Sequence, residues 1–150
     1  MSVKSDVCIG NNVIIYHPEL VNLYGCKIGD NCKIATFVEI QTGVEIGKNC
    51  KIEAFAFICT GVTIGDGVFI GPHVCFTNDK YPRAINDNGE LLNSDQWTIY
   101  PTIIEEGVSI GANSTIVCGI KIGKYSKIGA GSVVTKDVPE RTLLYGNPAR

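Results

Sequence analysis

A stretch in the middle of the chain gathers most of the side chains that could bind a polar ligand. It begins at Asn78 and Asp79, ends near Trp97, which is the only tryptophan, and carries amides, carboxylates and cations at close spacing. Its other polar or aromatic members are Lys80, Tyr81, Arg83, Asn86, Asp87 and Asn88. The plain alternative is a solvated excursion that tolerates polar residues. We expect this stretch to bind a ligand instead, because a tryptophan and a tyrosine without a binding role are unfavourable on a solvent-exposed surface.

The elements that position this stretch follow a six-residue period. An apolar residue returns at every sixth position over residues 28–76 and again over residues 104–134. These residues are Ile28, Ile34, Ile40, Ile46, Ile52, Ile58, Ile64, Ile70 and Phe76, then Ile104, Ile110, Ile116, Ile122, Ile128 and Val134. A second small or aliphatic residue follows each one four positions later. The pattern predicts an all-β fold, a parallel β-helix in which three hexads make one triangular coil of about 18 residues.

The period breaks once. Pro82 stands where the next apolar residue is due after Phe76, and the register returns only at Ile104. We therefore expect one domain over residues 1–150, with a loop inserted at about residues 78–103. An irregular opening coil over residues 1–27 and a short C-terminal cap should close its two ends, because an open β edge recruits other strands.

Charge and composition exclude several classes of protein. The formal net charge is −2, which does not suggest binding to nucleic acid or to a membrane surface. The apolar runs are far shorter than the roughly 20 residues of a membrane span, and the first residues do not resemble a signal peptide. We expect a cytoplasmic protein that binds neither nucleic acid nor membrane.

The cysteines and histidines do not predict a metal site. There are 7 cysteines without a Cys-x-x-Cys pair, which argues against a zinc knuckle and against a secreted disulfide framework. Most of them are expected to be small core residues, with Cys32 and Cys50 stacked and reduced. The two histidines, His17 and His73, cannot supply the three ligands of a γ-class carbonic anhydrase. No metal is expected.

The repeated Ile-Gly-x-x-small-x pattern resembles the hexapeptide-repeat acyltransferases. The resemblance implies that the β-helix is left-handed, whereas parallel crossovers are right-handed in about 98% of cases. It also implies a homotrimer whose active sites lie between subunits.

The central stretch is similar to a narrower group, the bacterial nucleotide-amino-sugar N-acetyltransferases. The likeness is carried by Phe76-Thr77-Asn78-Asp79-Lys80-Tyr81-Pro82-Arg83-Ala84 and by Asp95-Gln96-Trp97, and residues 23–30, 37–41 and 133–139 agree with it. It implies transfer of an acetyl group from acetyl-CoA to the C3 amine of a dTDP-linked or UDP-linked amino sugar. The product would serve the synthesis of a surface polysaccharide such as lipopolysaccharide. The sequence leaves the nucleotide and the sugar open.

The same resemblance implies roles for single residues. Asn78 would position the amine or the thioester, and Asp79 would pair with the sugar or accept a proton. The expected substrate contacts are Glu39, Gln41, Tyr81, Arg83 and Trp97. The expected contacts to acetyl-CoA are Ala112, Ala130, Gly131, Lys136 and Arg150. Alternatives exist, because Arg83 and Trp97 could pin the loop to its own coil and small residues are needed at corners in any case.

One departure from the group concerns the mechanism. Similar enzymes often carry Ser-His-x-Phe where this chain has Ala54-Phe55-Ala56-Phe57, so Phe55 replaces a histidine. His73 is the remaining candidate for a catalytic histidine, with an ordinary surface corner as its alternative. Some such enzymes need no histidine, because a neutral amine attacks and the departing sulfur takes the proton. Two other functions stay open, a sugar O-acetyltransferase and a silent scaffold that binds a nucleotide sugar.

Overall fold

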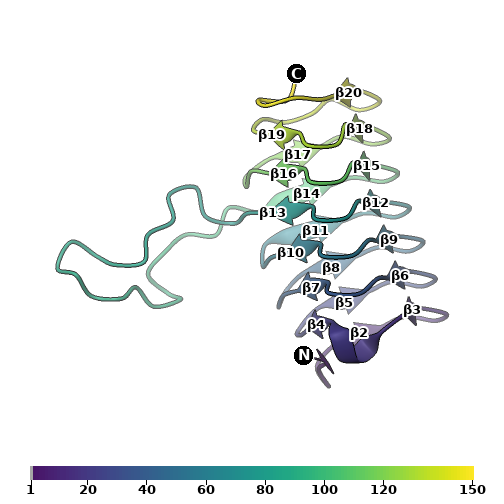
Figure 1. Cartoon of the computed structure of the whole chain (residues 1–150), viewed down its shortest axis with the longest axis horizontal. Coiled ribbons are helices and arrows are strands. Elements are labelled where there is room, and N and C mark those ends of the chain that lie inside the picture. The colour runs from purple at the N-terminus through teal and green to yellow at the C-terminus, as the bar shows by residue number, and fades with distance from the viewer. Residues whose placement is uncertain (1) are drawn as a thin grey trace.

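Three parallel sheets form the faces of a triangular prism in the computed structural model, which describes residues 2–150 (Figure 1). Face A consists of β1 (Ser2–Val3), β4 (Asn22–Leu23), β7 (Glu39–Ile40), β10 (Phe57–Ile58), β13 (Cys75–Phe76), β16 (Thr115–Ile116) and β19 (Val133–Val134). Face B consists of β2 (Cys8–Ile9), β5 (Lys27–Ile28), β8 (Glu45–Ile46), β11 (Val62–Ile64), β14 (Thr102–Ile104) and β17 (Lys121–Ile122). Face C consists of β3 (Ile14–Ile15), β6 (Lys33–Ile34), β9 (Lys51–Ile52), β12 (Phe69–Ile70), β15 (Ser109–Ile110), β18 (Lys127–Ile128) and β20 (Leu143–Leu144).

The chain visits faces A, B and C in turn, and the resulting coil is a left-handed β-helix, as the resemblance implied. Ile40 pairs with Ile58, and Ile46 pairs with Ile64, so equivalent residues lie 18 positions apart. Every leading residue of the hexads is at most 4% exposed. The six-residue period is therefore confirmed as the rule that places one aliphatic side chain per face and per coil in the core.

The register also locates the insertion. Ile64 pairs with Ile104, an offset of 40 positions in place of 18, so 22 extra residues have entered between β13 and β14. The strand β14 begins at Thr102, and the inserted loop thus occupies residues 77–101 rather than 78–103. Thr102 and Ile103 belong to face B, where they pair with Val62 and Thr63 of β11.

The corners force the backbone into conformations that side chains rarely adopt. At the corner between faces C and A, Phe37, Phe55, His73 and Asn113 all have φ near +60°, the left-handed region that costs a bulky residue about 1–3 kcal/mol. Glycine is needed where coils approach most closely. A Cβ on Gly71 would lie 2.7 Å from the main-chain nitrogen of Ala112.

The two ends of the prism are finished differently. The opening coil is loose, with a single-turn 3-10 helix η1 (Pro18–Leu20) and with Ile9 and Ile14 44% and 45% exposed. The last residues form the expected cap, because the Ala149 N–H donates to the carbonyl of Val133 at 2.8 Å. Within residues 2–150, no helix has the length and apolar content needed to cross a membrane.

Most of the cysteines do lie in the core. Cys26, Cys32, Cys50, Cys59 and Cys118 are buried, Cys75 is half-buried and Cys8 is exposed. Cys32 and Cys50 stack on adjacent coils as expected, and the Cys50 N–H points at the Cys32 sulfur at 3.4 Å. All seven thiols are free.

Candidate active site

The loop of residues 77–101 leaves the prism at the corner between faces A and B and projects well away from it (Figure 1). It is closed at its base, where the Tyr100 N–H donates to the carbonyl of Asn78 at 2.9 Å. Further out, Ile85 and Leu91 form an antiparallel bridge. The loop is therefore a hairpin-like arm that makes its own main-chain hydrogen bonds.

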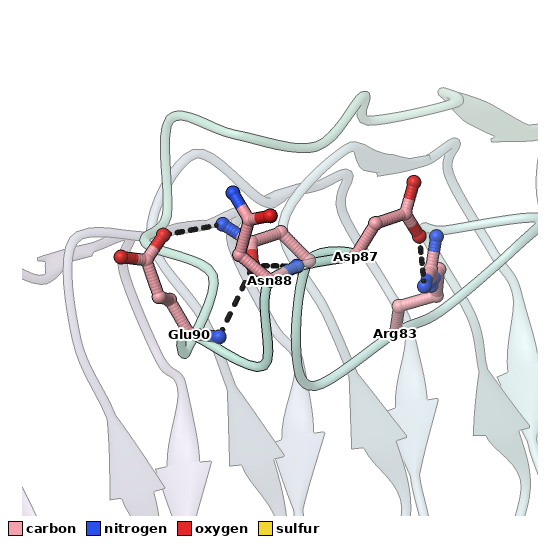
Figure 2. A network of polar contacts seen from close by, with 5 residues as sticks. Arg83, Asp87, Asn88 and Glu90 are labelled. Atoms are coloured by element: carbon pink, nitrogen blue, oxygen red, sulfur yellow. Dashed lines mark hydrogen bonds and ion pairs between the residues drawn. The ribbon is translucent and has the colours of Figure 1, made fainter.

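Polar side chains fix the tip of this arm (Figure 2). The Asn86 Oδ1 accepts from the N–H groups of Asn88 and Glu90 at 2.9 and 3.1 Å, and its Nδ2 donates to the Glu90 carboxylate at 2.8 Å. Nearby, the Arg83 Nη2 donates to the Asp87 Oδ1 at 2.8 Å. The alternative role of Arg83, pinning the loop to its own coil, is thus seen in part: its ion pair with Asp87 links two residues of the loop.

Two neighbouring hollows of about 350 and about 400 Å³ lie within the arm. Both are lined by Asp79, Arg83 and Trp97. Tyr81 lines the smaller hollow and Asn78 the larger one. The structure therefore brings together the five loop residues to which the resemblance assigned roles, and it supplies them with a concave surface of ligand size.

The two residues at the base of the arm are tied in different ways. The Asn78 Nδ2 donates to the carbonyl of Thr60 on the coil below at 3.0 Å. The Asp79 Oδ1 accepts from the Tyr81 N–H at 2.8 Å, which is a turn within the loop. The Lys80 Nζ lies 4.7 Å from the centre of the Tyr100 ring, a cation–π contact that joins the two sides of the base of the arm.

Glu39 and Gln41 lie below the arm, at the start of β7 and just beyond its end, and they contact each other. The Gln41 Nε2 and the Tyr24 hydroxyl both donate to the Glu39 Oε1, at 3.1 and 3.0 Å. The Gln41 Oε1 accepts from the Thr60 N–H at 3.2 Å. Burial, and next the bond to Glu39, raise the pKa of Tyr24. Neither Glu39 nor Gln41 lines the hollows, but both are linked to Asn78 through Thr60.

Tyr24 and Thr60 were not singled out in the sequence. The signal that could have found Thr60 is its spacing, because it precedes Asn78 by 18 positions and one coil is 18 residues long. A similar spacing could have pointed to Tyr24, because it lies one coil below Gln41 in the register of face A.

His73 is not brought close to Asn78 within the chain. It lies at the corner before β13, whereas Asn78 follows β13 at the opposite edge of face A. Its ring stacks on Phe55, with centroids 4.6 Å apart and planes at 6°, and Phe55 stacks on Phe37 at 4.8 Å. The three residues, which we name the aromatic stack, are exposed along this corner.

The residues expected to hold acetyl-CoA fall into two places. Ala112, Ala130 and Gly131 meet at the corner between faces C and A, where the Gly131 N–H donates to the carbonyl of Ala112 at 2.8 Å. Lys136 follows β19 at the corner between faces A and B, and Arg150 lies in the cap, its N–H donating to the carbonyl of Tyr145. One chain therefore gathers the small residues and carries Arg150 at the same corner, because Tyr145, which bonds to Arg150, lies against Gly129. Only Lys136 lies apart, at the next corner.

No group of three or more histidine, cysteine, aspartate or glutamate side chains suited to a metal ion occurs among residues 2–150.

Two family models match the coils. The bacterial transferase hexapeptide model (six repeats) matches residues 25–60 and 43–78, and the model of the hexapeptide repeat of succinyl-transferase matches residues 101–136. Together they cover more than half of the chain and leave out most of the arm.

One curated relative resembles the chain closely over a short segment. It is a dTDP-3-amino-3,6-dideoxy-alpha-D-galactopyranose 3-N-acetyltransferase of Aneurinibacillus thermoaerophilus, 63% identical over 49 residues, which are 33% of this chain and 26% of the relative. The chain spans roughly a third or less of the curated relatives that it matches first.

Solved structures extend the likeness to nearly the whole chain. A hexapeptide-repeat acetyltransferase of Vibrio cholerae, VCA0836, complexed with acetyl coenzyme A, is 28% identical with a TM-score of 0.60 and covers 97% of this chain and 68% of that one. A mutant of AntD, an N-acyltransferase from Bacillus cereus in complex with dTDP and coenzyme A, is 24% identical with a TM-score of 0.78 over 95% and 81% of the two chains. The second likeness is one of fold.

Proposed function

We propose that this chain, which belongs to the hexapeptide-repeat transferase family, is an N-acetyltransferase that acts on the C3 amine of a dTDP-linked or UDP-linked amino sugar. Acetyl-CoA is the acyl donor, and the product is a sugar for a surface polysaccharide. The observation that carries the proposal is the 63% identity over 49 residues to an enzyme named for this reaction on a dTDP-linked sugar. The likeness to an acetyltransferase complexed with acetyl coenzyme A supports the donor.

The chemistry of the hollows fits a nucleotide sugar. The Arg83 guanidinium can bind a diphosphate through two parallel hydrogen bonds, and the rings of Trp97 and Tyr81 can stack on a base or a sugar. Glu39 and Gln41 lie two coils below Asn78 on face A and complete the proposed substrate surface. An apolar ring beside a cation and a carboxylate is the combination that a charged, polyhydroxylated ligand requires.

The reaction asks little of the protein besides alignment. The neutral amine attacks the thioester carbonyl carbon, a carbon–nitrogen bond forms, the carbon–sulfur bond breaks, and the proton of the amine leaves on the sulfur of CoA. Asn78 positions the amine or the thioester, and Asp79 pairs with the sugar or accepts a proton. Alignment of two bound reactants alone can contribute about 7–11 kcal/mol to lowering the barrier.

Assembly is part of the proposal. Since His73 and Asn78 lie at opposite edges of face A, His73 can serve this site only from a neighbouring subunit of a homotrimer. The same holds for Ala112, Ala130 and Gly131 at that corner, with Lys136 and Arg150 meeting the phosphates of CoA. A cytoplasmic location follows from the two substrates, which are cytoplasmic metabolites.

The test is thiol release from acetyl-CoA by the purified protein, measured against dTDP-linked and UDP-linked 3-amino, 4-amino and hydroxyl-only sugars. Turnover confined to a 3-amino sugar is expected and identifies the nucleotide at once. Turnover of the hydroxyl-only sugars would replace the proposal with an O-acetyltransferase. Binding of nucleotide sugar without turnover would leave a silent scaffold.

A further inference from the structure

A chain of hydrogen bonds climbs the corner between faces A and B and ends at Asn78 in the loop. Its members are Tyr24, Glu39, Gln41, Thr60 and Asn78, which we name the corner ladder. Each contacts the next at 3.0 to 3.2 Å. All five are half-buried, so these bonds are stronger than they would be in water.

The main chain of Thr60 determines which way both amides in the ladder point. Its N–H can only donate and its carbonyl can only accept. Gln41 must therefore turn its Oε1 toward Thr60, at 3.2 Å, and Asn78 must turn its Nδ2 toward Thr60, at 3.0 Å. If the Gln41 amide were reversed, its NH2 group would face the Thr60 N–H, a donor against a donor. If the Asn78 amide were reversed, its oxygen would face the Thr60 carbonyl, an acceptor against an acceptor.

The opposite end of the Gln41 amide is held by Glu39. The Gln41 Nε2 donates to the Glu39 Oε1 at 3.1 Å, and the Tyr24 hydroxyl donates to the same oxygen at 3.0 Å. A carboxylate offers acceptors only, so this contact agrees with the orientation that Thr60 imposes. Gln41 cannot rotate without losing a bond at each end, and it holds the Thr60 main chain to the coil below.

The consequence falls on Asn78, whose other amide atom is left for a ligand. None of the hydrogen bonds within residues 2–150 uses the Asn78 Oδ1, and Asn78 lines the larger hollow of the arm. An oxygen acceptor suits the N–H of an amine and does not suit the oxygen of a thioester carbonyl. It also cannot serve as a base, so a hydroxyl gains no activation from it.

We propose that Gln41, together with Glu39, is a positioning residue that fixes the Asn78 amide with its Oδ1 toward the hollow, where it accepts a hydrogen bond from the substrate amine. The inference rests on the proposed function and deepens it, because it assigns Asn78 to the amine rather than to the thioester. The amine keeps its lone pair for attack on the acetyl carbon while its N–H is held by Asn78.

A double-mutant cycle on the purified protein tests this coupling. Gln41→Leu keeps the size of the side chain and removes both of its hydrogen bonds. It should lower kcat with a 3-amino sugar nucleotide by about 10- to 100-fold, because a misplacement near 1 Å can cost that much. In the Asn78→Ala background the same change should cost less than about twofold, since coupled residues are not additive.

Two further variants separate positioning from loss of structure. Glu45→Gln breaks the exposed ion pair with Lys27, at 3.2 Å, in the same coil as Gln41, and it should leave kcat within about twofold. The swap of Glu39→Gln with Gln41→Glu again places an amide opposite a carboxylate and keeps an acceptor for the Thr60 N–H. The Tyr24 hydroxyl, which shares the Glu39 Oε1 with Gln41, then accepts a hydrogen bond where it had donated one. The swap should recover most of the activity that Gln41→Glu loses by itself through the repulsion between two carboxylates.

Equal losses from Gln41→Leu in both backgrounds would mean that Gln41 acts independently of Asn78, and would overturn the proposal. A crystal structure of Gln41→Leu gives a readout without activity, in which Asn78 should leave the Thr60 carbonyl; an unmoved Asn78 also overturns it. If the wild-type protein releases no CoA with any amino sugar, the proposed function is wrong. The amine contact then falls with it, while the crystal structure still decides whether Gln41 orients Asn78.

Discussion

The coils and the arm satisfy their main-chain hydrogen bonds in different ways. In the coils the strand donors reach a neighbouring coil, as when the N–H of Gly47 donates to Ile64 at 2.8 Å. In the arm the donors return to the arm itself, as when the N–H of Leu92 donates to Ala84 at 2.9 Å. A change in one coil therefore strains its neighbours, whereas the outer part of the arm, beyond the residues at its base, can change its side chains without disturbing the coils.

The largest expected difference between the two regions is in stability, and it should appear when one apolar side chain is truncated in each of them. Ile110→Ala in β15 removes a side chain that is 0% exposed and should lower the free energy of unfolding by about 2–5 kcal/mol. Leu91→Ala in the arm removes one that is 77% exposed and should change it by less than about 0.5 kcal/mol. Urea denaturation at one protein concentration measures both, and similar midpoints for the two variants would contradict the comparison.

The next largest effect concerns Arg83, which either binds the substrate or only stabilises the arm through its ion pair with Asp87. Arg83→Ala and Asp87→Asn both break the same exposed ion pair at 2.8 Å, so each should change stability by less than about 1 kcal/mol. Only Arg83→Ala should also raise the KM for the nucleotide sugar, by about 10-fold, because a charged hydrogen bond to the diphosphate is lost. Steady-state kinetics of the matched pair decides, and equal KM values would assign Arg83 to fastening.

The coils were predictable from sequence because stacking imposes a period. Each core position repeats after 18 residues, so counting along the chain alone locates the leading residues from Ile28 to Val134 and the 22 inserted residues. The handedness of the helix could not be predicted in this way, because a sequence period is the same for a left-handed and a right-handed coil. It was predicted from the resemblance to a known family.

The arm was predictable in composition but not in shape. Its hairpin bridge between Ile85 and Leu91 and its ion pair between Arg83 and Asp87 obey no period. The link from Asn78 to Thr60 did obey one, since both lie at the same corner one coil apart. His73 shows that a short separation along the chain does not mean proximity. It precedes Asn78 by five positions, but strand β13 lies between them and carries the chain from one corner to the next.

A third prediction uses the thiols, which lie in the coils while the arm has no cysteine. Burial raises the pKa of Cys26 to about 11 and that of Cys59 to about 12, whereas an unfolded thiol ionises near pH 8.5. Between about pH 9 and pH 11 the unfolded chain loses protons that the folded chain keeps, so stability falls as pH rises. Each thiol should cost about 2 kcal/mol of stability between pH 8 and pH 10.

Chemical denaturation of the wild type and of Cys26→Ala with Cys59→Ala over this range measures the difference. The double variant starts from a lower stability but should lose less of it as the pH rises, and Cys8→Ala, in an exposed position of the opening coil, is the control. Parallel pH profiles for the wild type and the double variant would mean that the buried thiols ionise without cost in the folded protein.

The smallest expected effect on activity concerns the aromatic stack, and it tests whether a corner of the coils contributes to catalysis as the arm does. Since the Phe55 ring lies 4.6 Å from His73 and the amine can lose its proton to the departing sulfur, His73→Ala should lower kcat/KM by less than about 10-fold. The pH profile is the sharper readout: kcat/KM should rise with pH as the substrate amine deprotonates, with the same shape in wild type and variant. A base on His73 would add an inflection to this profile, which His73→Ala would remove together with the activity. That result would move the proton-accepting group from the substrates to a corner of the neighbouring subunit, and would make the aromatic stack part of the active site.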